Sequence, residues 1–206
     1  YDSIDILVNN AGAYFSKYIK TEEGLEKTFA LNHLSYFELT HLLLDMIKEG
    51  KPGRVINVAS SAHFTAKLDM NDIQMKNKYK GWTAYCNSKL MNVLFTYEIN
   101  KRYKDTNITF NCLHPGFVDT RFGDNNTGLG KKILSIGKKL IAIDVIKGAS
   151  TSVYLATSDD VSNTSGQFFD KSKPVKSSKV SYRESDQLKL WSYSKEIVDD
   201  LKSSLV

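Results

Sequence analysis

The sequence predicts an α/β fold in which a doubly wound parallel sheet is covered by helices on both faces. Three observations support this prediction: predicted strands alternate with predicted helices, the strands are continuous apolar runs, and a short motif follows directly after three of them. Alternation of this kind is typical of parallel sheets, because each parallel connection must cross over the sheet. Continuous apolar strands indicate burial on both faces.

The first half of the chain is predicted to contain two strands and one long helix. Residues Ile4–Val8 form a continuous apolar run, as expected of a buried parallel strand. A helix is predicted over Glu22–Ile47, with an interruption near Asn32. A Pro-Gly turn at 51–53 ends this region, and Arg54–Val58 is the next strand.

The second half continues the alternation. A helix is predicted over Gly81–Tyr103, where apolar residues recur at spacings of three and four. A strand at Ile108–Leu113, a helix at Asp144–Thr157 and a short last strand at Gly166–Phe169 follow. No repeat or low-complexity linker divides the sequence, so we expect one domain over residues 1–206.

Three motifs follow the predicted ends of strands. They are N-N-A-G at 9–12, N-V-A-S at 57–60 and P-G-F-V-D-T at 115–120. Ligands of parallel α/β sheets bind beyond the carboxyl ends of the strands. We therefore expect the three motifs to lie on one rim of the sheet and to form a binding site there.

A phenol and an ammonium lie four residues apart, at Tyr85 and Lys89. Positions i and i+4 share one face of a helix, so both groups face one site. A phenol with its ordinary pKa of about 10 is a weak acid or base at neutral pH, and a neighbouring ammonium favours the phenolate. The spacing alone is weak evidence, because Tyr and Lys are common on solvated helix faces.

In this order and at these spacings, the three motifs together with Asn32 and Y-x-x-x-K resemble the short-chain dehydrogenase/reductase family, from the first residues to about Gly166. Finer features resemble its retinol dehydrogenase-like branch. These are A-Y-C-N-S-K-L at 84–90, H-P-G at 114–116, the long interval from Ser60 to Tyr85, and the tail around Leu190 and Trp191.

The resemblance implies a catalytic set of Asn32, Ser60, Tyr85 and Lys89. Tyr85 is implied to exchange the proton with the substrate oxygen, while Ser60 holds that oxygen by a hydrogen bond. Lys89 is implied to lower the pKa of Tyr85 and to bind the nicotinamide ribose. Asn32 is implied to lie at a helix irregularity, where its backbone carbonyl holds a water that relays protons to Lys89. Taken alone, Asn32 is an ordinary polar residue of a helix.

The resemblance also implies a nicotinamide dinucleotide cofactor, with NADP(H) favoured over NAD(H) by the branch. The segment 10–12 would lie along the adenosine side, where small residues allow close approach, although an Asn-Gly segment is also an ordinary turn. The segment 115–120 would lie beneath the nicotinamide. The residues assigned to the cofactor are Asn10, Ala11, Gly12, Tyr85, Lys89, Pro115, Gly116, Val118 and Thr120.

One family feature is missing from the 206 residues. Family members begin with a strand and a T-G-x-x-x-G-x-G turn that holds the pyrophosphate at a helix N-terminus. This chain opens at residues 1–8 with what resembles the fourth strand. We therefore expect a Rossmann-like fold that lacks its first strands and helices, and interpret the chain as a fragment. The alternative to an enzyme is a catalytically silent fragment or interaction module.

Two segments are expected to choose the substrate. Residues 62–80 lengthen the loop between Ser60 and Tyr85, and residues 121–147 occupy the position of a substrate lid. The second segment carries apolar residues among Lys131, Lys132, Lys138 and Lys139, which favours a bulky apolar alcohol or carbonyl, such as a retinoid or another lipid aldehyde. The same pattern also fits an amphipathic helix packed on the core or a contact with a membrane surface.

Composition excludes several other functions. The chain is 41% hydrophobic and 25% charged, with a net charge of +5. Its lysine clusters lack interleaved aromatic residues, which argues against nucleic-acid binding. The two cysteines, Cys86 and Cys112, are expected to be buried thiols, and no metal-ligand spacing is present. No G-x-S-x-G motif accompanies His63 or His114, which argues against a Ser-His hydrolase.

Localisation and assembly follow from the resemblance only. The sequence has no apolar run of 18 residues, so no membrane-spanning helix is expected within it. The branch implies an intracellular protein, either cytoplasmic or associated with the endoplasmic reticulum membrane through an anchor not visible in this chain. The family also implies a homodimer through the helices at Glu22–Ile47 and Gly81–Tyr103.

Overall fold

One sheet organises the chain, and its first four strands are parallel. The computed structural model describes residues 1–49, 52–116 and 145–204. Within them, five strands form a single sheet in sequence order. The first four are parallel, and the last is antiparallel to the fourth. The strands are β1 (Ile6–Asn9), β2 (Gly53–Val58), β3 (Ile108–His114), β4 (Phe168–Asp170) and β5 (Lys173–Val175).

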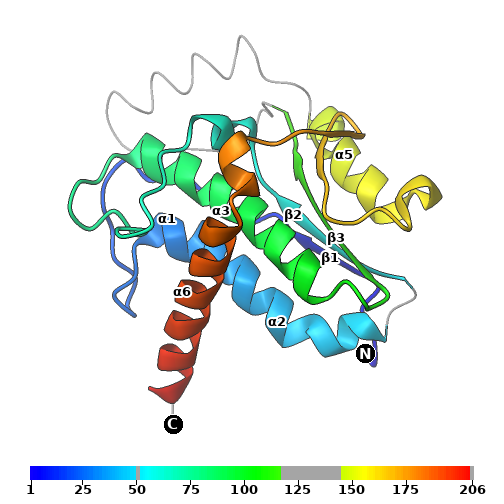
Figure 1. Ribbon diagram of the computed structural model, residues 1–206, viewed down its shortest axis with the longest axis horizontal. Helices are drawn as coiled ribbons and strands as arrows, with labels where there is room; N and C mark the ends of the chain where they lie inside the picture. The colour runs from blue at the N-terminus through cyan, green and yellow to red at the C-terminus, as the bar shows by residue number, and fades with distance from the viewer. Residues whose placement is uncertain (50–51, 117–144, 205–206) are drawn as a thin grey trace.

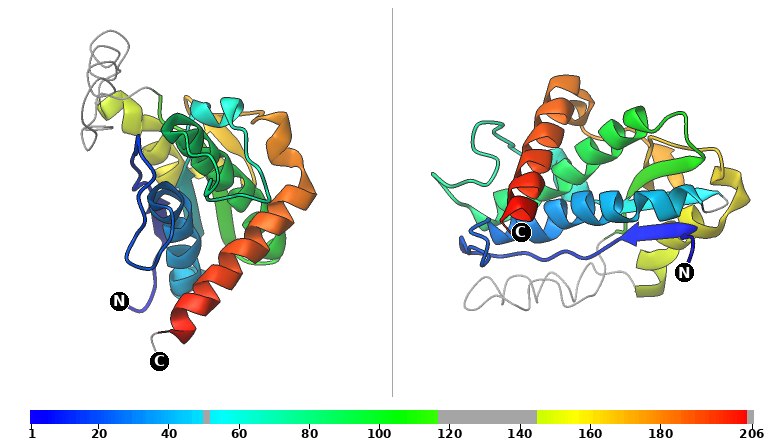
Figure 2. Two further views of the ribbon diagram at one scale, coloured as in Figure 1. Left: turned by 90° about the vertical axis from the view of Figure 1, so that its left-hand side faces the viewer. Right: turned by 90° about the horizontal axis from the view of Figure 1, so that it is seen from below.

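Helices cover both faces of this sheet. They are α1 (Lys27–Phe29), α2 (Ser35–Lys48), α3 (Gly81–Arg102), α5 (Val145–Thr157) and α6 (Glu184–Ser203). α2 and α3 pack on one face and α5 packs on the other (Figures 1 and 2). In β2, Val55 is buried on the side of α2 and α3, while the next residue, Ile56, is buried against α5. The predicted α/β fold with a parallel-dominated sheet is confirmed.

The helix expected over Glu22–Ile47 begins only with α1. Gly24 has a φ of +81°, a left-handed conformation that does not continue into a helix. The carboxylate of Glu26 then caps α1 by accepting hydrogen bonds from two backbone N–H groups of its first turn, at 2.8 and 2.7 Å. The interruption expected near Asn32 is present as a π-helical stretch, Ala30–Leu34, between α1 and α2.

The end of the sheet differs from the prediction. The strand expected at Gly166–Phe169 is β4, which begins at Phe168, and β5 was not predicted. The turn between them contains Lys171 and Ser172, with φ of 49° and 60°. Turns with positive φ are normally recognised by Asn or Gly. Lys and Ser at these positions carry no such signal, so this hairpin was not visible in the sequence.

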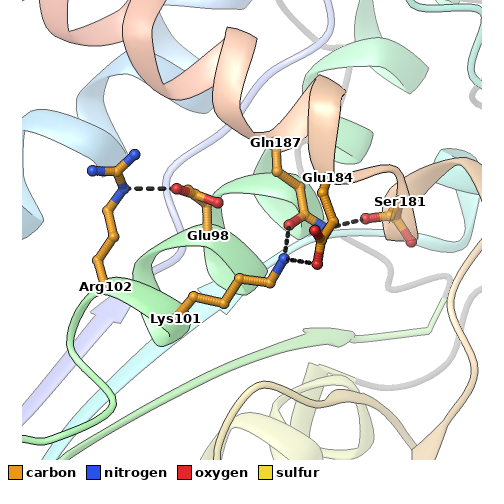
Figure 3. Close-up of polar contacts among 6 residues, drawn as sticks. All are labelled: Glu98, Lys101, Arg102, Ser181, Glu184 and Gln187. Atoms are coloured by element: carbon orange, nitrogen blue, oxygen red, sulfur yellow. Dashed lines mark hydrogen bonds and ion pairs between the residues drawn. The ribbon is translucent and has the colours of Figure 1, made fainter.

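The C-terminal helix α6 crosses the outside of α2 and α3 (Figure 1). The Arg102 guanidinium of α3 lies 4.3 Å from the ring centroid of Trp191. Nearer the start of α6, Lys101 of α3 donates hydrogen bonds to Glu184 at 2.6 Å and to Gln187 at 3.0 Å (Figure 3). These contacts attach α6 firmly to α3.

This attachment bears on the expected homodimer. Leu190 and Trp191 of α6 are buried against the other helices. Near the end of α6, Lys202 forms a 2.9 Å ion pair with Glu38 of α2. α6 therefore covers part of the α2 and α3 surface that the resemblance assigns to dimerisation. A dimer formed through that covered part would require α6 to be displaced.

The first strand is less buried than the sequence predicts. Leu7 is buried, but Ile6 and Val8 are each 40% exposed. Among the described residues, β1 pairs with β2 only and therefore forms an edge of the sheet. The prediction of burial on both faces is wrong for this strand, because its two outward apolar side chains are incompletely covered.

Other expectations have separate outcomes. Cys86 and Cys112 are buried free thiols, as predicted. Within residues 1–49, 52–116 and 145–204, no helix is long and apolar enough to cross a membrane. In the same ranges, no group of three or more His, Cys, Asp or Glu side chains is placed to hold a metal ion. Residues 121–144 of the expected substrate lid lie outside the described residues. The last three residues of the lid, 145–147, belong to α5.

Candidate active site

The ends of three parallel strands bring the sequence motifs to one rim of the sheet. Asn9, the last residue of β1, is in register with Asn57 of β2. Ser60 follows shortly after the end of β2, and Pro115 follows directly after β3. Because the three strands are parallel, their carboxyl ends lie at the same edge of the sheet. The rim inferred from the strand ends is therefore present.

α3 presents Tyr85 and Lys89 to this rim, one helical turn apart. Both side chains are buried, with exposed fractions of 9% and 4%. The Tyr85 hydroxyl forms a hydrogen bond with the side chain of Ser60. Lys89 Nζ lies 5.8 Å from the centroid of the Tyr85 ring and donates a 3.1 Å hydrogen bond to the carbonyl of Val58. The structure thus brings Ser60, Tyr85 and Lys89 together.

The hydrogen bonds of Ser60 determine what its hydroxyl can do. Ser60 precedes a short 3-10 helix, Ser61–Thr65, and its Oγ accepts a hydrogen bond from the N–H of Ala62 at 3.2 Å. A serine hydroxyl has one proton to donate and two lone pairs. Since one lone pair is occupied by Ala62, the proton can be donated to an oxygen at the rim, such as the Tyr85 oxygen or that of a carbonyl substrate.

Burial controls the acidity of the pair on α3. It raises the pKa of Tyr85 to about 12, although the hydrogen bond with Ser60 acts in the opposite direction. Burial also lowers the pKa of Lys89 to about 8. We expected Lys89 to lower the pKa of Tyr85, but the net direction is upward. Desolvation of the phenolate is the largest cause of this upward shift of the Tyr85 pKa.

Gly12 allows the rim to approach Lys89 closely. A Cβ atom at this position would lie 3.2 Å from Lys89 Nζ and 3.4 Å from Asn32 Oδ1. Contacts this short require the neighbouring atoms to move. Glycine is therefore suited to this position because it leaves room for the ammonium.

Asn32 holds the segment after β1 against α3. Its side chain is fully buried and lies in the π-helical stretch. Its Oδ1 accepts a hydrogen bond from Ala13 N–H at 2.8 Å, and its Nδ2 donates to the Ala13 carbonyl at 2.9 Å and to Ser88 Oγ at 3.0 Å. The side chain is therefore a structural clamp. The expected role of its backbone carbonyl in a proton relay stays a prediction.

The remaining predicted cofactor residues fall into two groups. Asn10, Ala11 and Gly12 are exposed at the rim, where a ligand can contact them. Pro115 and Gly116 are partly buried beyond β3, and Gly116 has a φ of +83°, which disfavours any side chain there. The other two predicted residues, Val118 and Thr120, lie outside the described residues.

A buried amide ladder supports the rim and was missed at the sequence level. Asn9 Nδ2 donates to Thr40 Oγ1 at 3.0 Å and to Asn57 Oδ1 at 2.8 Å. Asn57 Nδ2 in turn donates to Thr96 Oγ1 of α3 at 2.9 Å. The ladder joins β1 and β2 to α2 and α3. The available signal was the occurrence of Asn at or near the end of two mostly apolar strands.

An aromatic wall beside Tyr85 was also missed. The ring of Trp82, one turn earlier on α3, stacks on Tyr85 with 5.5 Å between centroids and an interplanar angle of 28°. Tyr14 meets Trp82 edge-on at 6.3 Å. Trp82 is 52% exposed, so much of its surface remains available for contact. Its spacing of three residues from Tyr85 on one helix could have indicated this contact.

Comparison with known proteins identifies the family of the chain. The family model for short chain dehydrogenase matches residues 1–128. Retinol dehydrogenase 14 of Mus musculus is 37% identical over 201 residues, covering 97% of this chain and 60% of that protein. Polyprenol dehydrogenase of Homo sapiens is 37% identical over 211 residues, covering 98% of this chain and 63% of that protein.

A similar fold has been solved for an uncharacterized protein from Mycobacterium paratuberculosis. Its TM-score is 0.74 and its sequence identity is 27%, with 97% of this chain and 68% of that chain covered. The chain spans about 60% of the length of the first curated relatives that it matches. The chain belongs to the short-chain dehydrogenase family, and within it the sequence is retinol dehydrogenase-like.

Proposed function

We propose that this chain carries the proton-transfer residues of an alcohol/carbonyl oxidoreductase that uses NADP(H). The observation that carries the proposal is the meeting of Ser60, Tyr85 and Lys89 at the rim where the strands end. A buried phenol held by a serine hydroxyl is suited to pass a proton to or from a substrate oxygen. The nicotinamide, when bound, supplies the hydride chemistry.

Each residue has a distinct part in this proposal. Tyr85 exchanges the proton with the substrate oxygen, and Ser60 donates a hydrogen bond to the same oxygen. Lys89 binds the ribose hydroxyls of the cofactor, for which it exchanges its bond to the Val58 carbonyl. Asn32 contributes a backbone carbonyl to proton relay and a side chain that holds the rim segment in place.

Two features of the rim support a dinucleotide. Small residues at 10–12 are exposed and allow close approach of a ligand, and Gly12 lies next to the ammonium of Lys89. We assign the cofactor to both rim segments and to α3, with NADP(H) favoured over NAD(H). The residues proposed to contact it are Asn10, Ala11, Gly12, Tyr85, Lys89, Pro115, Gly116, Val118 and Thr120.

The proposed substrate is a bulky apolar alcohol or carbonyl, such as a retinoid or another lipid aldehyde. Trp82 and Phe64 are both more than half exposed, at 52% and 53%, on segments that carry the catalytic groups. Exposed aromatic rings provide a large apolar surface that can cover an apolar chain. The curated relatives are named for retinol and polyprenol, which are long apolar alcohols. We retain the segment 121–147 as the proposed lid.

The competing proposal is a catalytically silent interaction module. It is favoured by one observation: the 206 residues contain no T-G-x-x-x-G-x-G turn, which supplies much of the phosphate affinity of the family. The two proposals differ in what a supplied turn would do. A chimera in which a strand, such a turn and a helix from a family member precede Tyr1 would turn over only if the site described above is competent.

Tyr85→Phe in this chimera is the decisive variant. It removes the hydroxyl and keeps the ring stacked on Trp82, so turnover should fall by about 10²–10⁴-fold while NADPH affinity stays near its starting value. Reduction of all-trans-retinal, followed by NADPH absorbance, measures the first quantity, and calorimetric titration measures the second. Equal turnover of both forms would exclude Tyr85 as the proton donor. Tight NADPH binding without any turnover would favour the silent module.

A further inference from the structure

His63 is buried directly behind the catalytic serine. It lies in the short 3-10 helix that Ser60 caps, and its side chain is 1% exposed. The centroid of its ring lies 4.1 Å from that of Phe64 and 4.8 Å from that of Phe168 of β4. A histidine so enclosed cannot reach a substrate, and the mechanism proposed above does not use it.

Both ring nitrogens of His63 are engaged, and their partners fix the tautomer. Nδ1 lies 2.6 Å from the backbone carbonyl oxygen of Ser60, and Nε2 lies 3.1 Å from the backbone nitrogen of Ser178. A backbone N–H can only donate, so Nε2 is the acceptor. The proton must then reside on Nδ1, from which it is donated to Ser60. Burial lowers the pKa of His63, which favours this neutral form.

The bond to Ser60 restrains the catalytic hydroxyl. The Ser60 carbonyl accepts two hydrogen bonds from His63, one from the ring and one from the backbone N–H at 3.1 Å. On the other side of the same residue, Oγ contacts Ala62 N–H and Tyr85. A peptide held at its carbonyl leaves little freedom for the side chain to turn away from Tyr85.

The bond to Ser178 connects His63 to the docked C-terminal region. The Ser178 carbonyl accepts hydrogen bonds from Ser181, through its N–H at 3.0 Å and its Oγ at 2.6 Å. The Ser181 carbonyl accepts one from Gln187 of α6 at 2.7 Å, and Gln187 accepts one from Lys101 of α3 at 3.0 Å. Figure 3 shows this last part, in which Gln187 lies between Lys101 and Ser181.

We infer that His63 is a positioning residue: it transmits the docking of residues 178–187 on α3 to the Ser60 peptide and so holds the Ser60 hydroxyl toward Tyr85. The inference rests on the proposed function for its effect on turnover. Its structural part stands on the chain of hydrogen bonds alone. A merely structural histidine would support folding without setting the geometry of Ser60.

Ser178 offers a test that leaves His63 itself in place. The backbone of Ser178 has φ −60° and ψ 146°, which proline adopts readily. Ser178→Pro therefore deletes the N–H donor at a compatible φ, and its ring occupies the place of that hydrogen and pushes the His63 ring away. Ser178→Ala is the matched control, because it keeps the N–H and removes a hydroxyl that has no hydrogen-bond partner within the described part of the chain.

The structural readout is the nitrogen NMR spectrum of the full chain labelled with ¹⁵N-histidine, together with the amide signal of Ser60. The chain contains four histidines, so His63→Phe assigns the signal. We expect an Nδ1–H tautomer in the unmodified chain and in Ser178→Ala, and loss of this preference in Ser178→Pro with a displaced Ser60 amide. An unchanged tautomer and an unchanged Ser60 amide in Ser178→Pro would overturn the inference.

The catalytic readout separates positioning from binding. In the chimera with the supplied turn, assayed with all-trans-retinal and NADPH, Ser178→Pro should lower kcat at least about tenfold with KM little changed, since small misplacements of a catalytic group are costly. Ser178→Ala should retain the full rate. Equal kcat values for the two variants would overturn the positioning role. If the chimera shows no turnover, the proposed function fails on its own, and the NMR result on the 206-residue chain alone decides whether His63 couples Ser178 to Ser60.

Discussion

Burial gives Tyr85 and Lys89 the opposite order of acidity from the one they have in water. The pKa of the phenol is raised to about 12, while that of the ammonium is lowered to about 8. In water both pKa values are about 10. The lysine therefore loses its proton first, and the phenol stays neutral through the physiological range. A neutral phenol is the form that can donate a proton to a carbonyl oxygen.

This arrangement predicts a specific pH dependence of stability. Because the pKa of Lys89 is lower in the folded state, the cost of burying its charge is fully present below pH 8 and disappears as the pH rises toward the unfolded value of about 10.4. The stability of the chain should thus rise across this range relative to Lys89→Met, by about 3 kcal/mol. Urea unfolding of both forms at pH 7.5 and pH 10.5 measures this difference.

The matched control is Lys104→Met, at an exposed position after α3. Comparison with this variant removes the effect of losing one unit of net charge. If Lys89→Met and Lys104→Met follow the same pH dependence, the ammonium of Lys89 is not held in a desolvated site. In an active form, Lys89→Met should also weaken NADPH binding, which the control should leave intact.

The exposed ring beside Tyr85 provides a second test at the residue scale. The chain has two tryptophans, and Trp82 is 52% exposed while Trp191 is 8% exposed. Acrylamide, a contact quencher, should therefore act mainly on Trp82. We expect decanal to protect this fluorescence and the polar aldehyde glyceraldehyde to leave it quenched, because only an apolar chain covers the indole.

Trp82→Phe is the control for this measurement. It leaves Trp191 as the sole tryptophan, so acrylamide quenching should be weak and decanal should have no effect on it. Protection by decanal that persists in Trp82→Phe would place the aldehyde elsewhere. Equal protection by both aldehydes would exclude an apolar site at this position.

At the scale of elements, the docking of α6 depends on one aromatic cluster. The Trp191 ring lies 5.1 Å from Phe37, 5.0 Å from His41 and 6.0 Å from Phe95, with Arg102 on its face. These partners come from α2 and α3, so a single side chain fastens α6 to both helices.

Trp191→Ala should therefore destabilise the chain by about 3–5 kcal/mol, as is usual when a buried aromatic side chain is truncated. Leu188→Ala, on the same helix at a position 49% exposed, should change stability by less than about 0.5 kcal/mol. Urea unfolding monitored by circular dichroism measures both. Similar losses for the two variants would mean that α6 is not held by the Trp191 cluster.

The elements that sequence reasoning found and missed differ in a physical way. β2 and β3 are short, mostly apolar and buried over almost their whole length, and α3 repeats apolar residues at spacings of three and four. α6 buries polar Gln187 and Ser194 alongside Leu190 and Trp191. Besides the aromatic cluster, its packing includes hydrogen bonds to other segments, which no local pattern reveals.

The candidate site shows the same division. Ser60, Tyr85 and Lys89 could be found because their order and spacing carry the chemistry. The net pKa of Tyr85 could not be predicted, since it depends on how completely neighbouring elements exclude water. The contact between His63 and Ser178 could not be predicted either, because the two residues are 115 positions apart in the sequence. Contacts of this range follow from the docking of α6 and not from any motif.

At the scale of the whole molecule, the two edge strands of the sheet differ in their residues. One edge strand is β5, a short antiparallel strand whose three residues include Lys and Pro. Charged residues and proline on an edge strand discourage pairing with other chains. The other edge strand is β1, whose residues are I-L-V-N and whose outward Ile6 and Val8 are each 40% exposed. β1 lacks the protective features of β5.

This asymmetry predicts that the 206-residue chain associates with itself through β1. An apolar edge strand with unpaired backbone groups is a template for pairing with another chain. Val8→Lys places a charge on the exposed side of the strand and should reduce association, as seen in sedimentation velocity over a range of protein concentrations. Leu188→Lys makes the same change of charge on α6, 49% exposed, and should have little effect. If both substitutions reduce association equally, the net charge governs association and the β1 edge does not. If neither substitution reduces association, β1 is not the associating surface.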